Sequence, residues 1–591
     1  MKIKDRKSEV LIIAIILVIQ TIVFIVTGIN KSYIHMDEAY SLGLASYNKL
    51  DIQENEDFYN TWHNKEYYED YLTVNASEKN SFLQVYENQK NDVHPPLYYL
   101  LLRIAMGFHM DSYSKWPGII LNIIIYVFIT IFMYLIIKKI LDGTDKCKEK
   151  SAILALISSL TLSSINNAIY IRMYALSTLN IVITTYLHLK LLDRKETNYK
   201  LLLAIGLSAL VGSLTHYYYL FYLAMLFIMF VVKYLKEKNF KELGKYIGTM
   251  FLAGIISLFI FPYSVQHMFF GYRGQGAISN LIDISQFISS MAQYILRIDM
   301  YVFNNILFII LVFILGVIIY KKSKKTKMLE VKNKYIKYIA FPTFCYTILV
   351  ALSSPWIELR YIMPVCSLIF ILILYFAYAL LKNIVKEKTL SKVMIGMFLL
   401  MFIMPSISNG VIDLVIGKDF RNEQETLYSS KTELVQKLKS ESNLPVDMFS
   451  IFSDASIDNT LLFIKDFKIE PEVLYSNKRN IAEIIRNNMD LPALYLLDSN
   501  HNRFLDDILL FANINESYIV RDVEYSEEKI KEIISDKDIS KGVLIFISDG
   551  QNNDDILDVI KNALELENVT YLKRLNACDV YLVKNWGNIY E

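Results

Sequence analysis

Several features that define common protein classes are scarce in this chain of 591 residues. It has only 4 cysteines, which are Cys147, Cys345, Cys366 and Cys578. They are scattered along the chain, and no two of them have the spacing of metal ligands. We therefore expect neither a disulfide framework nor a zinc site. The net charge is only +1, so bulk charge gives no reason to expect a nucleic-acid partner. The chain also has no tandem repeat and no low-complexity tract.

Apolar residues, in contrast, are abundant. Hydrophobic residues make up 54% of the chain and aromatic residues 13%, and the mean hydropathy is +0.31. Apolar runs of about 18 residues or more recur, and each can cross a hydrocarbon layer of about 30 Å. The sequence therefore predicts a polytopic α-helical protein integral to the plasma membrane.

The first apolar run, over residues 11–29, follows a basic start. It is too long for a signal peptide and no small-residue cleavage site follows, so we predict a retained helix over about 9–29 with a cytoplasmic N-terminus. Lysine-rich loops fall on the cytoplasmic side when the later spans are counted in order, which supports the alternation. About eleven spans from a cytoplasmic N-terminus would leave the C-terminus outside. The later spans are predicted at about 119–140, 151–168, 174–192, 200–215, 217–235, 245–263, 303–320, 336–353, 362–382 and 391–408.

Two regions are too polar for lipid. Residues 30–94 form a long first outer loop of a transmembrane domain over 1–416, and a short interfacial or re-entrant helix follows between His94 and Met110. Residues 417–591 predict a soluble extracytoplasmic α/β domain with a largely parallel sheet. It has no Gly-rich phosphate loop and no nucleophile elbow, so we assign it no catalysis. Its predicted strands are 448–453, 493–497, 518–523, 543–548 and 580–583, with helices over 480–488 and 554–566.

Adjacent carboxylates follow the first helix. Asp37 and Glu38 are expected where that helix meets water on the outer side. A carboxylate there can act as a general base on an acceptor hydroxyl or bind a metal ion. The plainer interpretation is a solvated pair or a helix cap.

Basic and aromatic side chains are predicted at other outer ends of spans. Arg172 and Arg360 are notable because Lys greatly outnumbers Arg here, and because the positive-inside bias disfavours outer cations. A guanidinium suits bidentate phosphate binding, although snorkelling, or pairing of Arg360 with Glu358, is the alternative. His94 and His216 can titrate near neutral pH, and their alternative role is in an aromatic belt at the membrane interface.

These motifs resemble those of the GT-C glycosyltransferases. The resemblance rests on Met36–Tyr40, His94–Tyr99, Arg172–Leu176, Thr215–Tyr217 and Glu358–Pro364, in this order and on one predicted side of the membrane. Within that superfamily, the chain resembles bacterial relatives of protein O-mannosyltransferases and of the lipid A aminoarabinose transferase. The similarity covers about residues 9–410.

The resemblance implies transfer of a sugar from a polyprenyl-phosphate-linked monosaccharide to an acceptor on the outer face, by an inverting single displacement. Asp37 would activate or orient the acceptor, and Glu38 would assist or bind a divalent ion. The donor and its phosphate would be bound by His94, Arg172, Tyr174, His216, Arg360 and Tyr361. The partners implied are the lipid-linked donor, membrane lipids and a glycan, lipid or protein acceptor. A metal cofactor is used only by some relatives.

Other functions compete with this interpretation. A transporter or flippase of lipid-linked sugars would carry its notable polar residues at mid-membrane depth, often in broken helices and paired repeats. A membrane scaffold whose C-terminal domain is the working part would leave the outer-face Asp, His and Arg residues unexplained. An inactive relative that keeps the fold is disfavoured by the intact pair of Asp37 and Glu38.

Overall fold

A computed structural model describes residues 3–31, 34–46, 58–281, 284–304, 306–323, 333–355 and 357–381, followed by shorter stretches between 488 and 584. Those stretches are 488, 490–498, 505, 508–512, 514–521, 525–548, 551–566, 568–574 and 578–584. Contacts divide the chain into two compact units. The first comprises residues 1–27, 93–97 and 122–468, and the second comprises residues 28–92, 98–121 and 469–591.

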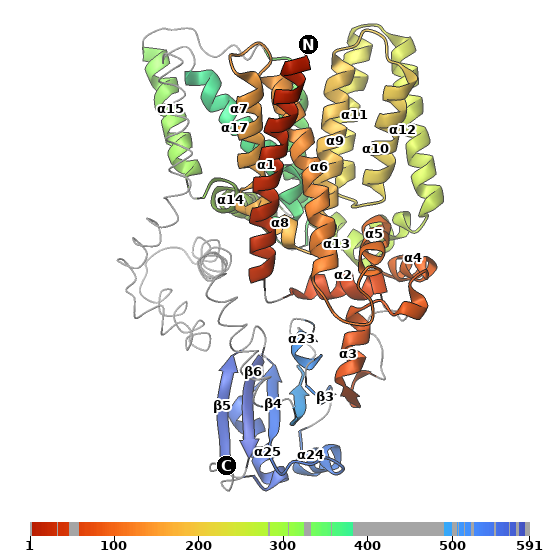
Figure 1. Cartoon of the computed structure of the whole chain (residues 1–591), viewed down its shortest axis with the longest axis vertical. Coiled ribbons are helices and arrows are strands. Elements are labelled where there is room, and N and C mark those ends of the chain that lie inside the picture. Colours follow the sequence, from red (N-terminus) through yellow and green to blue (C-terminus); the bar gives the residue numbers. More distant parts are fainter. Residues whose placement is uncertain are drawn as a thin grey trace. The chain divides into compact units, whose positions relative to one another are not determined.

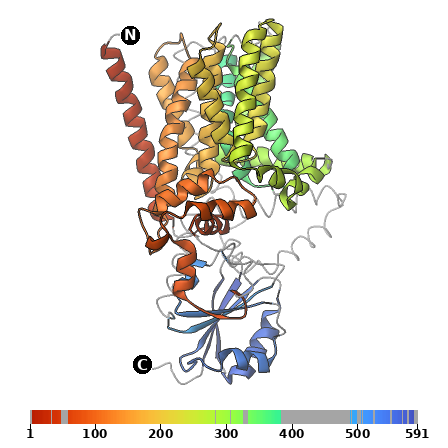
Figure 2. The same ribbon diagram turned by 90° about the vertical axis from the view of Figure 1, so that its right-hand side faces the viewer.

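Long apolar helices dominate the first unit and make this an integral membrane protein (Figure 1). Within the described residues, 7 helices are long and apolar enough to cross a membrane. They are α1 (Ile3–Asn30), α6 (Trp116–Ile140), α9 (Tyr174–Leu192), α11 (Tyr219–Lys236), α12 (Phe240–Ile260), α16 (Ile336–Ser353) and α17 (Leu359–Leu381). Figure 2 shows these helices running side by side, with α1 at the rim.

Bent helix pairs account for further predicted spans. One is α7 (Cys147–Ser159) with α8 (Leu162–Ile169), bent by 62°, and the other is α14 (Ile284–Phe303) with α15 (Leu307–Ser323), bent by 98°. The first bend arises because the Thr161 side chain accepts a hydrogen bond from the Ser164 backbone N–H and so begins a new helix. Counting each pair as one span gives up to 9 in the described part of the chain.

The predicted count of about eleven spans is therefore not confirmed. The span predicted at 200–215 corresponds to α10 (Tyr199–Ser213), which has only 15 residues, and the span predicted at 391–408 lies outside the described residues. The segment after His94 forms the short helix α5 (Leu97–Met106), which begins directly after the two prolines. The π-helical turn η4 (Gln266–Phe270) and α13 (Tyr272–Asn280) follow α12.

One end of the first unit is rich in lysine. The Asp193 carboxylate, just after α9, lies 2.6 Å from Lys334 Nζ and also pairs with Lys139. Near the start of α1, Glu9 pairs with Lys138 at the end of α6. The start of α1, the ends of α6 and α9 and the approach to α16 therefore meet at this end, which we call the lysine end.

The second unit combines the outer loop with the C-terminal sheet. Its outer-loop elements are α2 (Met36–Ser46), β1 (Trp62–Asn64), α3 (Lys65–Leu72), η3 (Ala76–Glu78), α4 (Phe82–Asn91) and most of α5. Its C-terminal elements are β2 (Pro492–Leu496), α23 (Ile508–Phe511), β3 (Glu516–Val520), α24 (Glu527–Ile534), β4 (Val543–Ser548), α25 (Asn553–Leu564), β5 (Asn568–Arg574) and β6 (Cys578–Lys584).

The sheet has 6 strands in the order β1-β3-β2-β4-β6-β5. The central strands β3, β2 and β4 are parallel, whereas β1, β6 and β5 pair antiparallel to their neighbours. The described sheet is thus mixed rather than largely parallel. Only three residues separate β5 from β6, and so short a connection permits only antiparallel pairing.

Side chains alternate between the two faces of the sheet. Leu494, Ile545 and Ile547 pack with α24 and α25 on one face, where they form a buried core. Tyr495 and Phe546 lie between these positions and contact Phe511 of α23 on the other face, with ring centroids 5.7 and 5.2 Å away. The result is the α/β region predicted from strand and helix alternation.

The predicted domain boundary between 416 and 417 lies outside the described residues, as do the predicted strand 448–453 and nearly all of the predicted helix 480–488. The other predicted strands overlap β2, β3, β4 and β6, and the predicted helix 554–566 overlaps α25. No pattern predicted β1. It pairs with β3 from Trp62↔Tyr518 to Asn64↔Glu516, and it joins the outer loop to the C-terminal sheet.

Candidate functional site

The end of the first unit opposite the lysine end carries arginine, histidine and tyrosine side chains. The turn between α8 and α9 places Arg172 there, because the Arg172 N–H donates to the Tyr170 carbonyl at 2.7 Å. Asn122 of α6 donates to the same carbonyl at 2.6 Å. Arg172 is only 6% exposed, so the turn holds a guanidinium in a largely buried position.

The turn between α10 and α11 brings His216 to Tyr174 at the start of α9. Their ring centroids lie 5.5 Å apart, and the His94 ring lies 6.2 Å from that of His216. Nδ1 of His216 accepts a hydrogen bond from the Tyr218 N–H at 3.1 Å. This bond leaves Nε2 as the ring nitrogen that carries the proton in the neutral form.

The start of α17 completes this group. The Tyr361 ring lies 6.3 Å from that of Tyr174 and 5.7 Å from that of Tyr218. Arg360 donates from Nη1 to the Tyr170 hydroxyl at 3.3 Å, and its guanidinium carbon lies 5.5 Å from the centre of the Tyr361 ring. We call His94, Arg172, Tyr174, His216, Arg360 and Tyr361 the arginine-end cluster.

Burial and positive charge set the protonation of this cluster. Burial, followed by the nearby His94 and the Arg172 guanidinium, lowers the pKa of His216 well below its ordinary value. Burial likewise raises the pKa of the Tyr218 phenol. His216 is therefore a neutral hydrogen-bonding group near neutral pH, and Arg172 and Arg360 supply positive charge to the cluster.

Arg297 was missed by the sequence reasoning. It lies on α14 with an exposed fraction of 7%, and its Nη1 lies 3.4 Å from Oε2 of Glu358. Glu358 was the acid considered as a partner for Arg360, and the described ion pair joins it to Arg297 instead. The scarcity of Arg, which drew attention to Arg172 and Arg360, would also have identified Arg297.

The acidic pair belongs to the second unit, at the start of α2. His35 precedes the helix, and its Nδ1 accepts from the Asp37 N–H at 3.1 Å. Glu38 reaches back to accept from the His35 N–H at 2.9 Å through Oε2. This is the reciprocal arrangement of a capping box, with a histidine in place of the usual Ser or Thr.

Glu38 has a second interaction that defines its role. Its Oε1 lies 2.5 Å from Lys31 Nζ, and the two side chains are only 2% and 8% exposed. Both carboxylate oxygens of Glu38 are thus used within the unit. The Asp37 side chain is 14% exposed and lies 3.7 Å from His35 Nδ1, which makes it the more accessible carboxylate.

Other contacts fix the far end of α2. Nη1 of Arg103 donates to the carbonyls of Ala45 and Ser46 at 3.0 and 3.1 Å, so it satisfies the last carbonyls of the helix. Gly43 lies directly against Tyr71 of α3, because an added Cβ there would be 2.1 Å from the Tyr71 ring. Arg103 therefore has a structural role in α2.

The acidic pair does not fit a metal site. Both Glu38 oxygens are taken by Lys31 and the His35 N–H. Within the described ranges, no group of three His, Cys, Asp or Glu side chains is placed to share a metal ion. We therefore derive no step through a metal.

No protein-family model and no curated protein matches the sequence. The structure is similar to that of ArnT from Cupriavidus metallidurans bound to undecaprenyl phosphate, with a TM-score of 0.50 and 9% identity over 96% of this chain and 97% of that chain. The same protein in the apo state gives a TM-score of 0.47 and 10% identity over 98% of each chain. ArnT is a lipid A aminoarabinose transferase with a GT-C fold, and the first comparison confirms the GT-C fold that the motifs predicted.

Proposed function

We propose that the protein transfers a sugar from a polyprenyl-phosphate-linked monosaccharide to an acceptor hydroxyl on the outer face of the membrane. The observation that carries this proposal is the arginine-end cluster. In it, guanidinium groups, histidines and tyrosines meet from the segment before α5, the α8–α9 turn, the start of α9, the α10–α11 turn and the start of α17. The GT-C fold supports it, and ArnT with that fold was crystallised with undecaprenyl phosphate.

The donor phosphate is assigned to the arginines of this cluster. Arg172 is largely buried and Arg360 stands beside the Tyr361 ring. A guanidinium group can donate two parallel hydrogen bonds to two oxygens of one phosphate. In a site of low dielectric it also stabilises the negative charge that develops on the phosphate as it leaves. His94 and His216 supply further hydrogen bonds, and Tyr174 and Tyr361 form the aromatic wall of the donor site.

Asp37 is assigned to the acceptor. In an inverting displacement, the acceptor oxygen bonds to the anomeric carbon while the bond from that carbon to the phosphate oxygen breaks. The electron pair leaves with the polyprenyl phosphate, and the acceptor proton passes to the Asp37 carboxylate. Glu38 is assigned a positioning role through its bonds to Lys31 and the His35 N–H.

The lysine end gives the topology. Lysines concentrate in cytoplasmic loops of membrane proteins, so the lysine end is assigned to the cytoplasm. Glu9 pairs with Lys138 at that end, which supports a cytoplasmic N-terminus. The arginine-end cluster is then assigned to the outer side. The C-terminal sheet is also assigned there, because its strand β1 belongs to the loop that follows α1.

The test is sugar transfer by the purified full-length protein from a panel of polyprenyl-phosphate sugars. Asp37→Asn should abolish transfer while leaving membrane insertion intact, because the amide cannot take the acceptor proton. Glu66→Gln, an exposed acid on α3 in the same unit, is the matched control and should keep full activity. Full activity of Asp37→Asn would refute the assignment. Comparing surface glycans of cells with and without the protein would identify the sugar and acceptor together.

A further inference from the structure

The C-terminal sheet is joined to the helix that carries Asp37. One of its strands, β1, belongs to the outer loop, and α3 begins at the residue after that strand. α3 then packs on α2 through Tyr71. We infer that the sheet positions α2 for the transfer reaction, and that Tyr68 and Tyr71 of α3 are the positioning residues. The inference rests on the proposed function for the role of Asp37.

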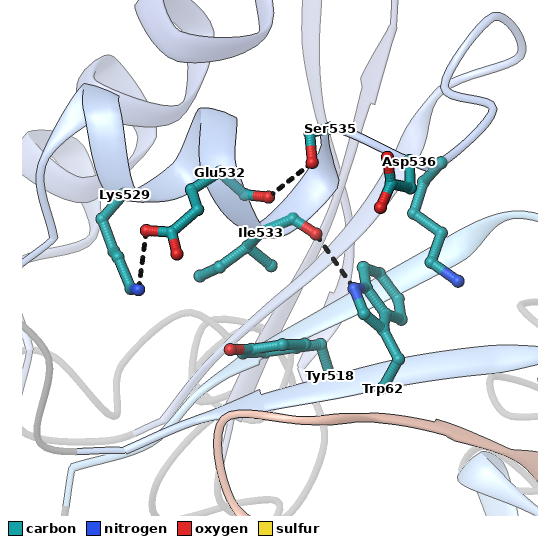
Figure 3. A pocket seen from close by; sticks show the side chains of 8 residues that line it. Trp62, Tyr518, Lys529, Glu532, Ile533, Ser535 and Asp536 are labelled. Atoms are coloured by element: carbon teal, nitrogen blue, oxygen red, sulfur yellow. Dashed lines mark hydrogen bonds and ion pairs between the residues drawn. The ribbon is translucent and has the colours of Figure 1, made fainter.

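β1 is anchored both to the sheet and to α24. Its three residues pair antiparallel with β3, and Nε1 of Trp62 donates to the Ile533 carbonyl at 2.9 Å (Figure 3). Lys537 Nζ lies 4.5 Å from the centre of the Trp62 ring, and the Tyr518 ring centroid lies 5.4 Å from it at an interplanar angle of 66°. These contacts enclose the indole, so β1 and the start of α3 are fixed to the sheet.

β1 leads into α3 without an intervening residue. Asn64 is the last residue of β1 and the N-cap of α3, where its side chain accepts a hydrogen bond from the Tyr67 N–H at 3.2 Å. The hydroxyls of Tyr68 and of Ser517 on β3 lie 2.6 Å apart, and both residues are fully buried. The Tyr68 ring centroid also lies 5.7 Å from that of Phe511. The direction of α3 is therefore set by contacts with the sheet and with α23.

The far end of α3 lies against α2. Tyr71 is only 2% exposed, and its ring leaves no room for a Cβ at Gly43 of α2. Its backbone carbonyl accepts a hydrogen bond from Oγ of Ser46 at 2.9 Å. Tyr68 and Tyr71 are three residues apart, so they lie on the same side of α3. A displacement of α3 on the sheet therefore displaces the helix that carries Asp37.

The alternative is that α3 only docks the outer loop on the sheet. α2 has other supports, because Arg103 of α5 and Asn88 of α4 donate to carbonyls in its last turn. Those bonds hold one end of α2, whereas the packing of Tyr71 on Gly43 acts on the side of the helix. The inclination of α2, and with it the place of Asp37, depends on this side contact. The two explanations predict different behaviour of α2 when α3 is loosened from the sheet.

The experiment is hydrogen–deuterium exchange on the full-length protein in nanodiscs. Tyr68→Phe removes the hydroxyl that meets Ser517 and keeps the ring. Amide exchange should become at least about tenfold faster in both α3 and α2, because loss of one partner from a buried hydrogen bond changes an equilibrium by about this factor. Tyr581→Phe is the matched control. Its hydroxyl accepts a hydrogen bond from Asn553 at 3.0 Å, but it lies on β6, three strands away from β3, so exchange in α2 should not change.

A second variant guards against misfolding. Ser517→Ala removes the same contact from the side of the sheet and should also speed exchange in α2. Exchange in β4 should stay unchanged in every variant and shows that the sheet is intact. Faster exchange that is confined to β1 and α3 would overturn the inference, and so would equal exchange of α2 in Tyr68→Phe and Tyr581→Phe.

Sugar transfer separates positioning from stability. The donor is assigned to the first unit, so Tyr68→Phe should leave the KM for the lipid-linked donor unchanged. It should lower kcat at least about tenfold, because a small misplacement of a catalytic group slows the reaction steeply. Unchanged kcat in Tyr68→Phe, when Asp37→Asn is inactive, would overturn the inference. Transfer that survives Asp37→Asn contradicts the proposed role of Asp37, whereas unchanged exchange of α2 contradicts the positioning by the sheet alone.

Discussion

The buried ion pair between Lys31 and Glu38 gives a quantitative prediction about α2. The two groups are 2.5 Å apart, and their side chains are 8% and 2% exposed. Glu38→Ala would remove the anion and leave the Lys31 ammonium buried without it. Removing one partner of such a pair costs about 3–5 kcal/mol. The lost capping bond to the His35 N–H costs about 1 kcal/mol more.

Hydrogen–deuterium exchange measures this local change in the full-length protein. A loss of about 4 kcal/mol, the lower end of this sum, should speed amide exchange in α2 by nearly a thousandfold, because each 1.4 kcal/mol is about a factor of ten. Glu87→Ala is the matched control. The Glu87 and Lys90 side chains are 45% and 37% exposed, and loss of such a surface pair should change stability by less than about 1 kcal/mol.

A double variant isolates the buried charge. Lys31→Met combined with Glu38→Gln removes both charges and keeps an acceptor for the His35 N–H, so most of the protection should return. Unchanged exchange in Glu38→Ala would contradict the structural role of the pair. Failure of the double variant to restore protection would show that the buried charge is not the cause.

Other perturbations test single features of both units. Arg360→Ala should weaken use of the lipid-phosphate donor roughly a hundredfold in kcat/KM, while Arg194→Ala at an exposed position should not; unchanged donor kinetics would exclude the phosphate role. Gly43→Ala should destabilise the second unit by about 1–3 kcal/mol and lower its melting temperature, because the new methyl group would collide with Tyr71. Gly276→Ala is the control and should have little effect, because its methyl group would enter open space. The free energy of unfolding should fall as pH drops below about 6.5, because His216 is then protonated in the unfolded chain while the folded protein keeps it neutral. This loss of stability should be smaller in His216→Gln. Equal pH dependence of the two proteins would contradict the prediction.

Local patterns identified the elements well. Runs of apolar residues predicted α1, α6 and α9, since the length and hydropathy of a membrane helix are properties of one continuous segment. The β-rich run at 543–548 coincides with β4 for the same reason, because a buried strand is a short apolar stretch. The mixed direction of the sheet was not predicted, since direction depends on how connections close in space.

The sequence did not predict which charged residues form ion pairs with one another. Glu358 is two residues from Arg360, yet its ion pair is with Arg297, 61 residues away. Glu38 stands beside Asp37 with the same functional group, and burial with Lys31 gives it a different role. Neighbours in sequence point in different directions from a helix, so their partners depend on packing.

The sequence by itself determined that this is a polytopic membrane protein with a C-terminal α/β region. The GT-C fold was predicted from the resemblance of its arginine, histidine and tyrosine motifs, which lie in the first unit. Only the tertiary structure decided that β1 of the outer loop is a strand of the C-terminal sheet and that Arg297 forms the ion pair with Glu358. It also decided that Glu38 pairs with Lys31, while Asp37 is the more accessible carboxylate. The physical reason is that hydropathy and periodicity are local properties of the chain. Strand pairing and ion pairing depend on contacts between distant residues, whose cost in chain entropy is met only by the packed fold.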